Sequence, residues 1–295
     1  MRIVETFAES RAERSGRTGL VPTMGYLHEG HLSLVTIAAQ QSDTVMASLF
    51  VNPLQFDDAS DLDRYPRDLD RDAALLEAAG CDVLFAPPVE EVYPSTPLAR
   101  VTVEGLTDTM EGAHRPGHFD GVATVVAKLF AGMQPDLAVF GRKDAQQFVV
   151  VSRVAADLSL PVEVIGGPTL RERDGLALSS RNVFLSADER RAALGISRGL
   201  MAAADAAEAG ERSGPVLEGL VLEEMERESL EIEYAELASS ADTARLAVLD
   251  RPGFLAVAAK SGRTRLIDNV WLDPDGTVDR GRRLGDESVL YGGGE

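Results

Sequence analysis

Two of the chain's four histidines, His28 and His31, lie three residues apart in the segment MGYLHEGHL at residues 24–32. The segment follows the apolar run TGLVPT and precedes HLSLVTIAAQQ, which has helical periodicity, so it is expected to join a strand to a helix. Spacing of three at a helix start puts both imidazoles on one side, and Gly30 lets a ligand approach the backbone closely. The free N–H groups of a helix start attract phosphate, and imidazoles can stabilise charge that grows on phosphate oxygens. The pattern indicates a phosphate-binding turn, with two capping or packing histidines as the alternative.

A zinc site is not expected from these residues. The zinc-protease motif needs histidines four apart with a glutamate next to the first, whereas HEGH closes one residue early and no third ligand is evident. The single cysteine, Cys81, opens the apolar run CDVLFAPP, so we expect a buried thiol and neither a disulfide nor a multi-cysteine metal site.

Charged residues also follow a later predicted strand, LAVFG. The segment GRKDAQQ at residues 141–147 comes directly after it and should lie at the ligand-binding edge of a parallel sheet. Lys143 is a mobile positive charge that suits phosphate. Asp144 could bind Mg²⁺ through oxygen or could cap the next helix, and Gln147 could face the site or solvent.

Three further segments carry candidate binding groups. FVNPLQF places the amides of Asn52 and Gln55 after another strand, where they indicate recognition of a small polar substrate or else a turn. ALSSRN at residues 177–182 has the composition of a phosphate clamp, although serine-rich loops are also common. HRPGHFDG at residues 114–121 could meet a carboxylate substrate or could be an ordinary helix entry.

The overall charge limits the partners of the chain. The 295 residues include 48 acidic and 29 basic side chains, a formal net charge of −19. A surface with this much negative charge repels nucleic acid and anionic membranes. Neither is therefore an expected partner. No apolar stretch reaches membrane-spanning length, and the first residues lack the apolar region of a secretory signal. We therefore expect a soluble cytoplasmic protein.

Short β-branched runs alternate with helical patterns up to about residue 170, which predicts an α/β fold with a doubly wound, Rossmann-like parallel sheet. Beyond it, Ser186 and Glu189 predict a helix start, a second helix follows, and three alternating runs predict an antiparallel sheet. Two domains are expected: residues 1–170, and a smaller α+β domain at 171–295 that closes over the active site.

The HEGH turn is similar to the HxGH signature of the nucleotidylyltransferase superfamily. Six segments, in order from about residue 18 to residue 272, resemble more narrowly the pantothenate synthetase (pantoate–β-alanine ligase) family: PTMGYLHEGHLSLV, FVNPLQF, HRPGHFDGVATVV, GRKDAQQ, DGLALSSRN and TRLIDN. The resemblance implies a Rossmann-like fold of the nucleotidylyltransferase type. It also implies ATP-dependent joining of (R)-pantoate and β-alanine through a pantoyl adenylate, with Mg²⁺, releasing AMP and diphosphate.

The resemblance also implies roles for individual residues, in a homodimer formed through the first domain. The implied ATP contacts are Met24, Gly25, His28, Gly30, His31, Gly141, Lys143, Asp144, Leu170, Leu178, Ser179, Ser180 and Arg181. The implied contacts to pantoate and β-alanine are Met24, Asn52, Gln55 and Gln147. The implied catalytic group is His28, His31, Lys143, Ser179 and Arg181, with Asp144 as the candidate Mg²⁺ ligand.

Some positions depart from the family pattern. Arg142 stands where the family usually has Glu, Ala145 where it has Tyr or Thr, and Leu178 where it has Met; the last change preserves volume. Arg142 could point to solvent or tune phosphate affinity. Two other functions stay open: a different adenylyl or cytidylyl transferase, and a nucleotide-binding regulator without catalysis. Residues 57–68 are polar enough to form a gate over the site.

Overall fold

The computed structural model describes residues 1–56, 62–63 and 65–291, and half of the proposed gate at 57–68 lies outside them. The chain divides into two compact units. The N-terminal unit comprises Met1–Thr107, Gly112–Gly141 and Val150–Gly167, and the C-terminal unit comprises Asp108–Glu111, Arg142–Val149 and Pro168–Glu295. The predicted boundary near residue 170, and the closing role of the second domain, stay predictions.

A parallel sheet of six strands forms the centre of the N-terminal unit, in the order β1-β4-β3-β2-β5-β6. The strands are β1 (Arg2–Val4), β2 (Thr18–Thr23), β3 (Thr44–Leu49), β4 (Val83–Phe85), β5 (Leu137–Gly141) and β6 (Glu163–Gly167). Five of them are the predicted apolar runs, and the predicted α/β parallel sheet is confirmed. The three-residue strand β1 was not predicted from the sequence.

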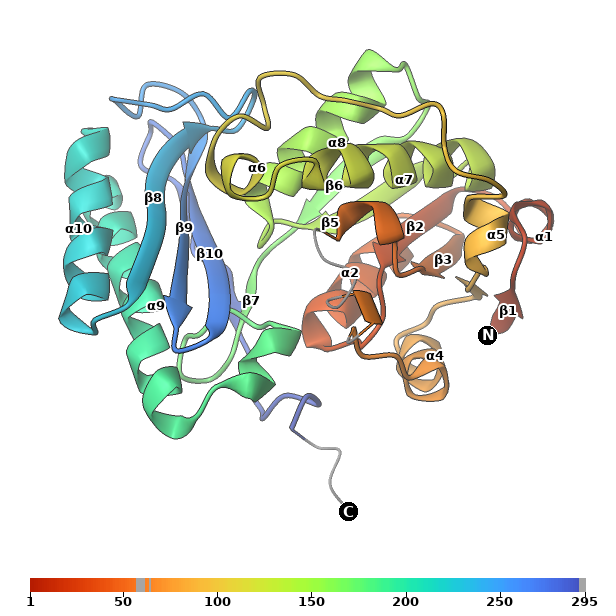
Figure 1. Cartoon of the computed structure of the whole chain (residues 1–295), viewed down its shortest axis with the longest axis horizontal. Helices are drawn as coiled ribbons and strands as arrows, with labels where there is room; N and C mark the ends of the chain where they lie inside the picture. Colours follow the sequence, from red (N-terminus) through yellow and green to blue (C-terminus); the bar gives the residue numbers. More distant parts are fainter. Residues whose placement is uncertain (57–61, 64, 292–295) are drawn as a thin grey trace. The chain divides into compact units, whose positions relative to one another are not determined.

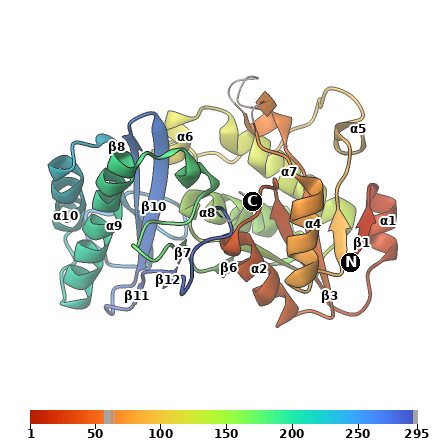
Figure 2. The same ribbon diagram turned by 90° about the horizontal axis from the view of Figure 1, so that it is seen from below.

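Helices cover both faces of this sheet. In Figures 1 and 2, α2 and α4 lie on one face and α7 lies on the other. The helices that belong to this unit alone are α1 (Phe7–Ala12), α2 (Glu29–Ala39), α4 (Leu69–Ala78), α5 (Val89–Val92) and α7 (His118–Met133). Helices α6 (Met110–His114) and α8 (Ala145–Asp157) contribute residues to both units. Because β2 and β3 are covered on both faces, nearly all their side chains are buried, as their continuous apolar sequences predict.

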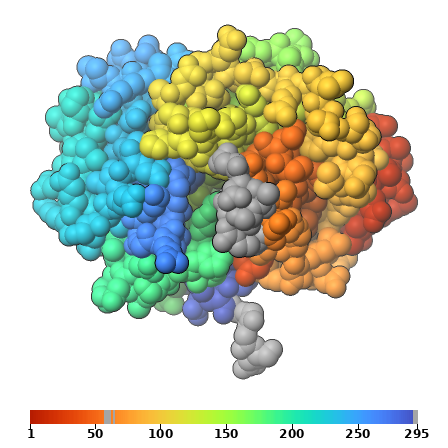
Figure 3. Space-filling model, in the orientation of Figure 1, coloured from red at the N-terminus to blue at the C-terminus, as the bar shows by residue number. Residues whose placement is uncertain are grey.

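Residues 94–107, which follow α5, contain no helix or strand and run over the surface of the N-terminal unit (Figure 3). Leu98 in this segment is fully exposed. Within the described residues, no helix is long and apolar enough to cross a membrane.

An antiparallel sheet in the order β11-β10-β9-β8 forms the C-terminal unit together with α9 (Ala187–Glu208) and α10 (Gly214–Arg227). Its strands are β8 (Glu231–Ser239), β9 (Gly253–Ser261), β10 (Thr264–Leu272) and β11 (Val278–Asp279). Apolar side chains of both helices and three strands make one buried core. The predicted antiparallel sheet is therefore confirmed. The short strands β7 (Leu170–Arg171) and β12 (Arg282–Arg283), which pair in parallel, were not predicted.

The start of α9 has the predicted capping box. The Glu189 N–H donates to the Ser186 hydroxyl at 3.3 Å, and the Ser186 N–H donates to Glu189 Oε2 at 2.8 Å. The hydrogen bonds from the Ser186 backbone and side chain hold the pKa of the Glu189 carboxyl below its ordinary value of 4.5. The ionised carboxylate therefore stabilises this helix start.

We expect Ser186→Ala to lower the free energy of unfolding of the C-terminal unit by about 1 kcal/mol, because a helix N–H loses its acceptor. Trp271, the only tryptophan, lies in β10 of the same unit, so its fluorescence can report denaturant unfolding. Ser240→Ala is the matched control, since it removes a hydroxyl that donates to the Pro252 carbonyl outside any helix start. Equal stability of Ser186→Ala and the native chain would contradict the capping role.

The same cap predicts a pH dependence. The pKa of Glu189 is lower in the folded chain than in the unfolded chain, so its stabilisation is fully present above pH 4.5 and is lost as the pH falls through the folded value. The stability difference between the native chain and Glu189→Gln should therefore shrink as the pH falls from about 5 to about 3. A difference that stays constant over this range would show that the charge of Glu189 is not involved.

Candidate functional site

The order of the parallel strands predicts where a ligand binds. Strands β2 and β5 are neighbours, and from this pair the chain proceeds toward opposite edges of the sheet, through β3 and β4 on one side and β6 on the other. Ligands of doubly wound sheets bind outside the carboxyl ends of the strands at such a switch point. The segment from Met24 to His31 follows β2 directly, and Gly141 ends β5. The predicted phosphate-binding turn therefore begins at the switch point.

A buried carboxylate on α4 holds this turn. Gly25 and Tyr26 have positive φ angles of 90° and 53°. The N–H groups of Tyr26 and Leu27 donate to the two oxygens of Asp72 at 2.7 Å and 2.8 Å. Asp72 is fully buried, and burial raises the pKa of its carboxyl, while the two N–H donors oppose that rise. The conformation of the turn thus depends on a carboxylate more than forty residues away in the sequence.

Arg71 contacts the same turn from the same helix. Its Nη2 donates to the Leu27 carbonyl at 3.0 Å, and its Nη1 donates to Asp72 Oδ1 at 3.2 Å. Its guanidinium carbon also lies 5.2 Å from the centroid of the Tyr26 ring. Sequence reasoning did not single out Arg71 or Asp72, because two charged residues near a helix start are ordinary surface features.

Both histidines use the same ring nitrogen in local contacts. The Gly30 N–H donates to His28 Nδ1 at 3.1 Å, so His28 caps α2, and the His28 N–H donates to His31 Nδ1 at 3.3 Å. The two ring centroids are 4.1 Å apart. An Nδ1 that accepts a hydrogen bond carries no proton, so each neutral ring carries its proton on Nε2. The capping interpretation is confirmed for His28, and it fixes both imidazoles as Nε2 donors.

The two predicted amides bind each other in the N-terminal unit, and that of Gln55 also contacts Met24. Asn52 Oδ1 accepts the Leu54 N–H at 3.2 Å, while its Nδ2 donates to Gln55 Oε1 and to the Gly121 carbonyl, both at 3.0 Å. Backbone partners on both sides therefore fix the orientation of the Asn52 amide. Because Asn52 occupies Gln55 Oε1, the Nε2 of Gln55 points the other way and lies 3.0 Å from Met24 Sδ. The amide of Gln55 is held as a hydrogen-bond donor.

Other residues support this amide pair. The Tyr93 hydroxyl donates to Asn52 Oδ1 at 2.9 Å, and burial raises the pKa of that hydroxyl. His118 Nδ1 and Arg115 Nη2 both donate to the Gln55 carbonyl, at 2.9 Å and 3.2 Å. Arg115 and His118, two residues of the candidate segment HRPGHFDG, thus bind the backbone of Gln55. Tyr93 was missed, since nothing local in its sequence marks it.

The helix that follows this loop packs closely against the amide segment. A Cβ atom on Gly121 would lie 2.2 Å from the Leu54 carbonyl oxygen. Only glycine lets α7 approach the 3₁₀ turn η1 (Pro53–Gln55) this closely, which in turn lets Asn52 reach the Gly121 carbonyl.

The C-terminal unit contains most of the other predicted residues. Lys143 Nζ lies 3.9 Å from Asp144 Oδ1, immediately before α8 begins at Ala145. Gln147, in the first turns of α8, is half-buried. Its neighbour Gln146 is buried and donates to the Thr109 carbonyl at 3.0 Å, so Gln146 has a structural contact within this unit.

Two further groups belong to this unit. The Leu178 N–H donates to the Leu170 carbonyl at 2.9 Å, and the Leu178 side chain is only 1% exposed. Ser179 caps the 3₁₀ turn η2 (Ser180–Phe184) by accepting the Arg181 N–H at 3.3 Å, and the Arg181 side chain is exposed. The structure therefore joins Leu170 to Leu178 and Ser179 to Arg181, while their contacts to a nucleotide stay predictions.

Arg142, which departs from the family pattern, packs within the C-terminal unit. Its guanidinium carbon lies 5.0 Å from the Trp271 ring centroid and 6.0 Å from that of Phe148. Its Nη1 also lies 3.3 Å from Asp279 Oδ2. Aromatic faces and a carboxylate thus stabilise the positive charge, so the side chain does not extend freely into solvent.

The described residues contain no group of three or more His, Cys, Asp or Glu side chains that could hold a metal ion. Mg²⁺ often binds to one or two carboxylates together with substrate phosphates and water. The single carboxylate of Asp144 fits an ion that arrives with a nucleotide better than a resident metal ion.

Comparisons with known proteins identify the family of this chain. The family model described as pantoate-beta-alanine ligase matches residues 2–271. A pantothenate synthetase of Pelotomaculum thermopropionicum is 51% identical over 279 residues, which cover 92% of this chain and 99% of that protein. A pantothenate synthetase of Herpetosiphon aurantiacus is 49% identical over 274 residues, which cover 92% of this chain and 99% of that protein.

Solved structures show the same fold. The crystal structure of pantothenate synthetase from Thermus thermophilus is 50% identical with a TM-score of 0.86, covering 91% of this chain and 98% of that one. The pantoate-beta-alanine ligase of Francisella tularensis was solved in complex with beta-gamma ATP and beta-alanine. It is 31% identical with a TM-score of 0.74, and the match covers 91% of this chain and 97% of that one. This chain therefore belongs to the pantoate-beta-alanine ligase family.

Proposed function

We propose that this protein joins (R)-pantoate and β-alanine to form pantothenate, converting ATP to AMP and diphosphate through a pantoyl adenylate. The observation that carries the proposal is the paired-histidine turn at the switch point of a Rossmann-like sheet, in a chain of this family. A turn that fixes two imidazole Nε2–H donors beside a helix start suits the stabilisation of a reacting phosphate.

In the first half-reaction, the pantoate carboxylate attacks the α-phosphorus of ATP, and diphosphate leaves with the electrons of the broken P–O bond. Negative charge increases on the phosphoryl oxygens and on the leaving group. His28 and His31 donate hydrogen bonds from Nε2, and Lys143 supplies a positive charge. Ser179 and Arg181 bind the same phosphates. This step needs little proton transfer, so His31 acts by electrostatics.

Pantoate binds beside the histidine turn. The Nε2 of Gln55 donates to an oxygen of pantoate, in the direction that Asn52 imposes on the amide. Met24 forms the apolar side of this subsite, and Gln147 supplies a second amide. A donor fixed before the substrate binds loses little conformational entropy on binding.

In the second half-reaction, the amine of β-alanine attacks the acyl carbon, the C–O bond to the phosphate breaks, and AMP leaves. The attacking amine loses a proton in forming the amide. Exclusion of water protects the adenylate between the two steps. The predicted closing role of residues 171–295 would provide that exclusion.

The remaining predicted residues bind the nucleotide around these groups. They are Gly25, Gly30, Gly141, Asp144, Leu170, Leu178 and Ser180. Asp144 would hold a Mg²⁺ ion that accompanies ATP, and the ion would supply positive charge to the phosphates. We also propose a homodimer in the cytoplasm, as the family resemblance implies.

The products distinguish this function from the alternatives. With ATP, Mg²⁺ and pantoate, we expect multiple turnovers to release AMP only after β-alanine is added, because the adenylate stays bound until the amine attacks. Chromatography of the nucleotides measures this directly. A stable nucleotidyl product would indicate another nucleotidyl transferase. An absence of turnover with both amine and nucleotide acceptors would favour a nucleotide-binding regulator without catalysis.

We expect His31→Ala to lower kcat by about 100-fold or more with a smaller change in KM for ATP, because a contact that strengthens in the transition state is lost. Steady-state AMP release measures both constants. His114→Ala is the control, since His114 is an exposed histidine outside the proposed site, and its rate should stay near the native value. A native rate in His31→Ala would remove His31 from the mechanism.

Asp72→Asn tests the support of the histidine turn. The amide keeps the shape of the carboxylate but offers one acceptor oxygen in place of two, so one of the Tyr26 and Leu27 N–H groups loses its partner. We expect stability to fall by about 1–3 kcal/mol and kcat to fall by about 10-fold. Asp70→Asn, on an exposed position of the same helix, is the control. Native kcat in Asp72→Asn would show that the turn does not need the carboxylate.

A further inference from the structure

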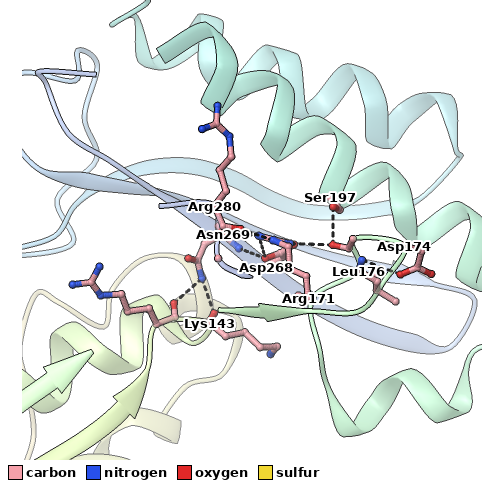
Figure 4. Close-up of polar contacts among 12 residues, drawn as sticks. Lys143, Arg171, Asp174, Leu176, Ser197, Asp268, Asn269 and Arg280 are labelled. Atoms are coloured by element: carbon pink, nitrogen blue, oxygen red, sulfur yellow. Dashed lines mark hydrogen bonds and ion pairs between the residues drawn. The ribbon is translucent and has the colours of Figure 1, made fainter. Parts of the chain in front are cut away.

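One segment that resembles the family, TRLIDN at residues 264–269, has no role in the proposed mechanism. It lies on β10 and ends in Asn269, whose side chain is buried. Asn269 Nδ2 donates to two successive backbone carbonyls, that of Arg142 at 3.0 Å and that of Lys143 at 2.6 Å (Figure 4). All three residues belong to the C-terminal unit.

We propose that Asn269 is a positioning residue for the reaction, which acts by fixing the backbone from which the Lys143 side chain extends. The inference rests on the proposed function, because it takes Lys143 as the cation that stabilises the phosphates. Asn269 itself contacts neither substrate nor the reacting atoms.

The backbone at Lys143 needs such a support. Lys143 lies in the short connection between the end of β5 at Gly141 and the start of α8 at Ala145. The Asp144 carbonyl accepts the Phe148 N–H, as at a regular helix start, whereas the two carbonyls before it are bound by β10. The Trp271 indole N–H is a second donor to the Arg142 carbonyl, at 3.4 Å. A lysine side chain is long and flexible, so a fixed backbone limits the region that its ammonium group can reach.

Asn269 is itself held by a buried ion pair. Asp268 Oδ1 accepts the Asn269 N–H at 2.7 Å, and Arg171 Nη2 donates to the Asn269 carbonyl at 3.1 Å. Arg171 and Asp268 form a two-point contact at 2.6 Å and 3.0 Å, and both side chains are buried. Two parallel N–H···O contacts fix the relative orientation of their partners as well as their distance.

This network joins two segments for which the family resemblance implies ATP contacts. Arg171 follows Leu170 on β7, so a continuous path of hydrogen bonds runs from the strand of Leu170 through Asp268 and Asn269 to the backbone of Lys143 (Figure 4). The path holds the two segments in a fixed relation within one unit before any nucleotide binds.

A purely structural role explains this asparagine less well. Its Oδ1 is buried and has no hydrogen-bond partner among the residues that the structure describes. A buried acceptor without a partner costs folding free energy, so packing alone would favour an apolar side chain at this place. The donation to the Lys143 segment accounts for an amide there.

A double-mutant cycle tests the proposal in the full chain. Asn269→Ala, Lys143→Ala and the double variant are compared with the native protein by steady-state AMP release. If Asn269 acts through Lys143, Asn269→Ala should lower kcat by about 10-fold in the native background and by less than about 2-fold when Lys143 is already absent. Equal fold-losses in both backgrounds would overturn the proposal, because the effect would then not depend on Lys143.

Ser197→Ala controls for general damage to the same network. The Ser197 hydroxyl donates at 2.8 Å to the Gly175 carbonyl, which also accepts from Arg171 Nη1 at 3.3 Å (Figure 4). Loss of the hydroxyl should lower the free energy of unfolding, which Trp271 fluorescence measures. It should leave kcat near the native value. A kcat loss in Ser197→Ala as large as that in Asn269→Ala would overturn the positioning role.

The cycle can be repeated with Asn269→Ser if the alanine variant does not fold, since a hydroxyl retains a polar group but cannot reach both carbonyls. The two proposals can fail separately. A native enzyme that forms no AMP with pantoate and β-alanine would refute the proposed function and, with it, this inference. An active native enzyme with an additive cycle would refute the positioning role alone.

Discussion

The hydrogen bonds from two backbone N–H groups to the buried carboxylate of Asp72 determine the shape of the histidine turn, and the placement of His28 and His31 depends on that shape. Two consecutive residues, Gly25 and Tyr26, have positive φ, which is unfavourable for the tyrosine. A carboxylate that is fully buried also loses hydration. The N–H donors and Arg71 offset both costs, so a strained turn and a buried charge stabilise each other.

The same arrangement recurs around the other candidate residues. Buried polar groups, several of them distant in sequence, contact the candidate side chains or the backbone that carries them. Asn52 binds the amide of Gln55 and is itself bound by Tyr93, while His118 binds the Gln55 carbonyl and Asn269 binds the Lys143 carbonyl. Asn269 is buried while Lys143 is not, so at this position orientation and access to ligand are provided by different residues.

Sequence patterns predicted the features that depend on residues close together in the chain. Alternation of buried strands and amphipathic helices gave the parallel sheet, and the Ser186 capping box lies within four residues. The supports could not be predicted in this way. Asp72 lies 46 residues from Tyr26, Tyr93 lies 41 from Asn52, and Asn269 lies 127 from Arg142. Their partners are chosen by tertiary packing, and no local periodicity records that choice.

Arg142 shows how a charge reversal can be accommodated beside a predicted binding segment. Its side chain is held over Trp271 and beside Asp279, whereas Asn269 binds its backbone carbonyl. Every residue type offers that carbonyl, so the support of Lys143 does not depend on whether position 142 carries Glu or Arg. The substitution was the only feature of the sequence that favoured a regulator without catalysis. Because the side chain has its own partners and the backbone keeps the contact that orients Lys143, Arg142 gives no reason to prefer that alternative.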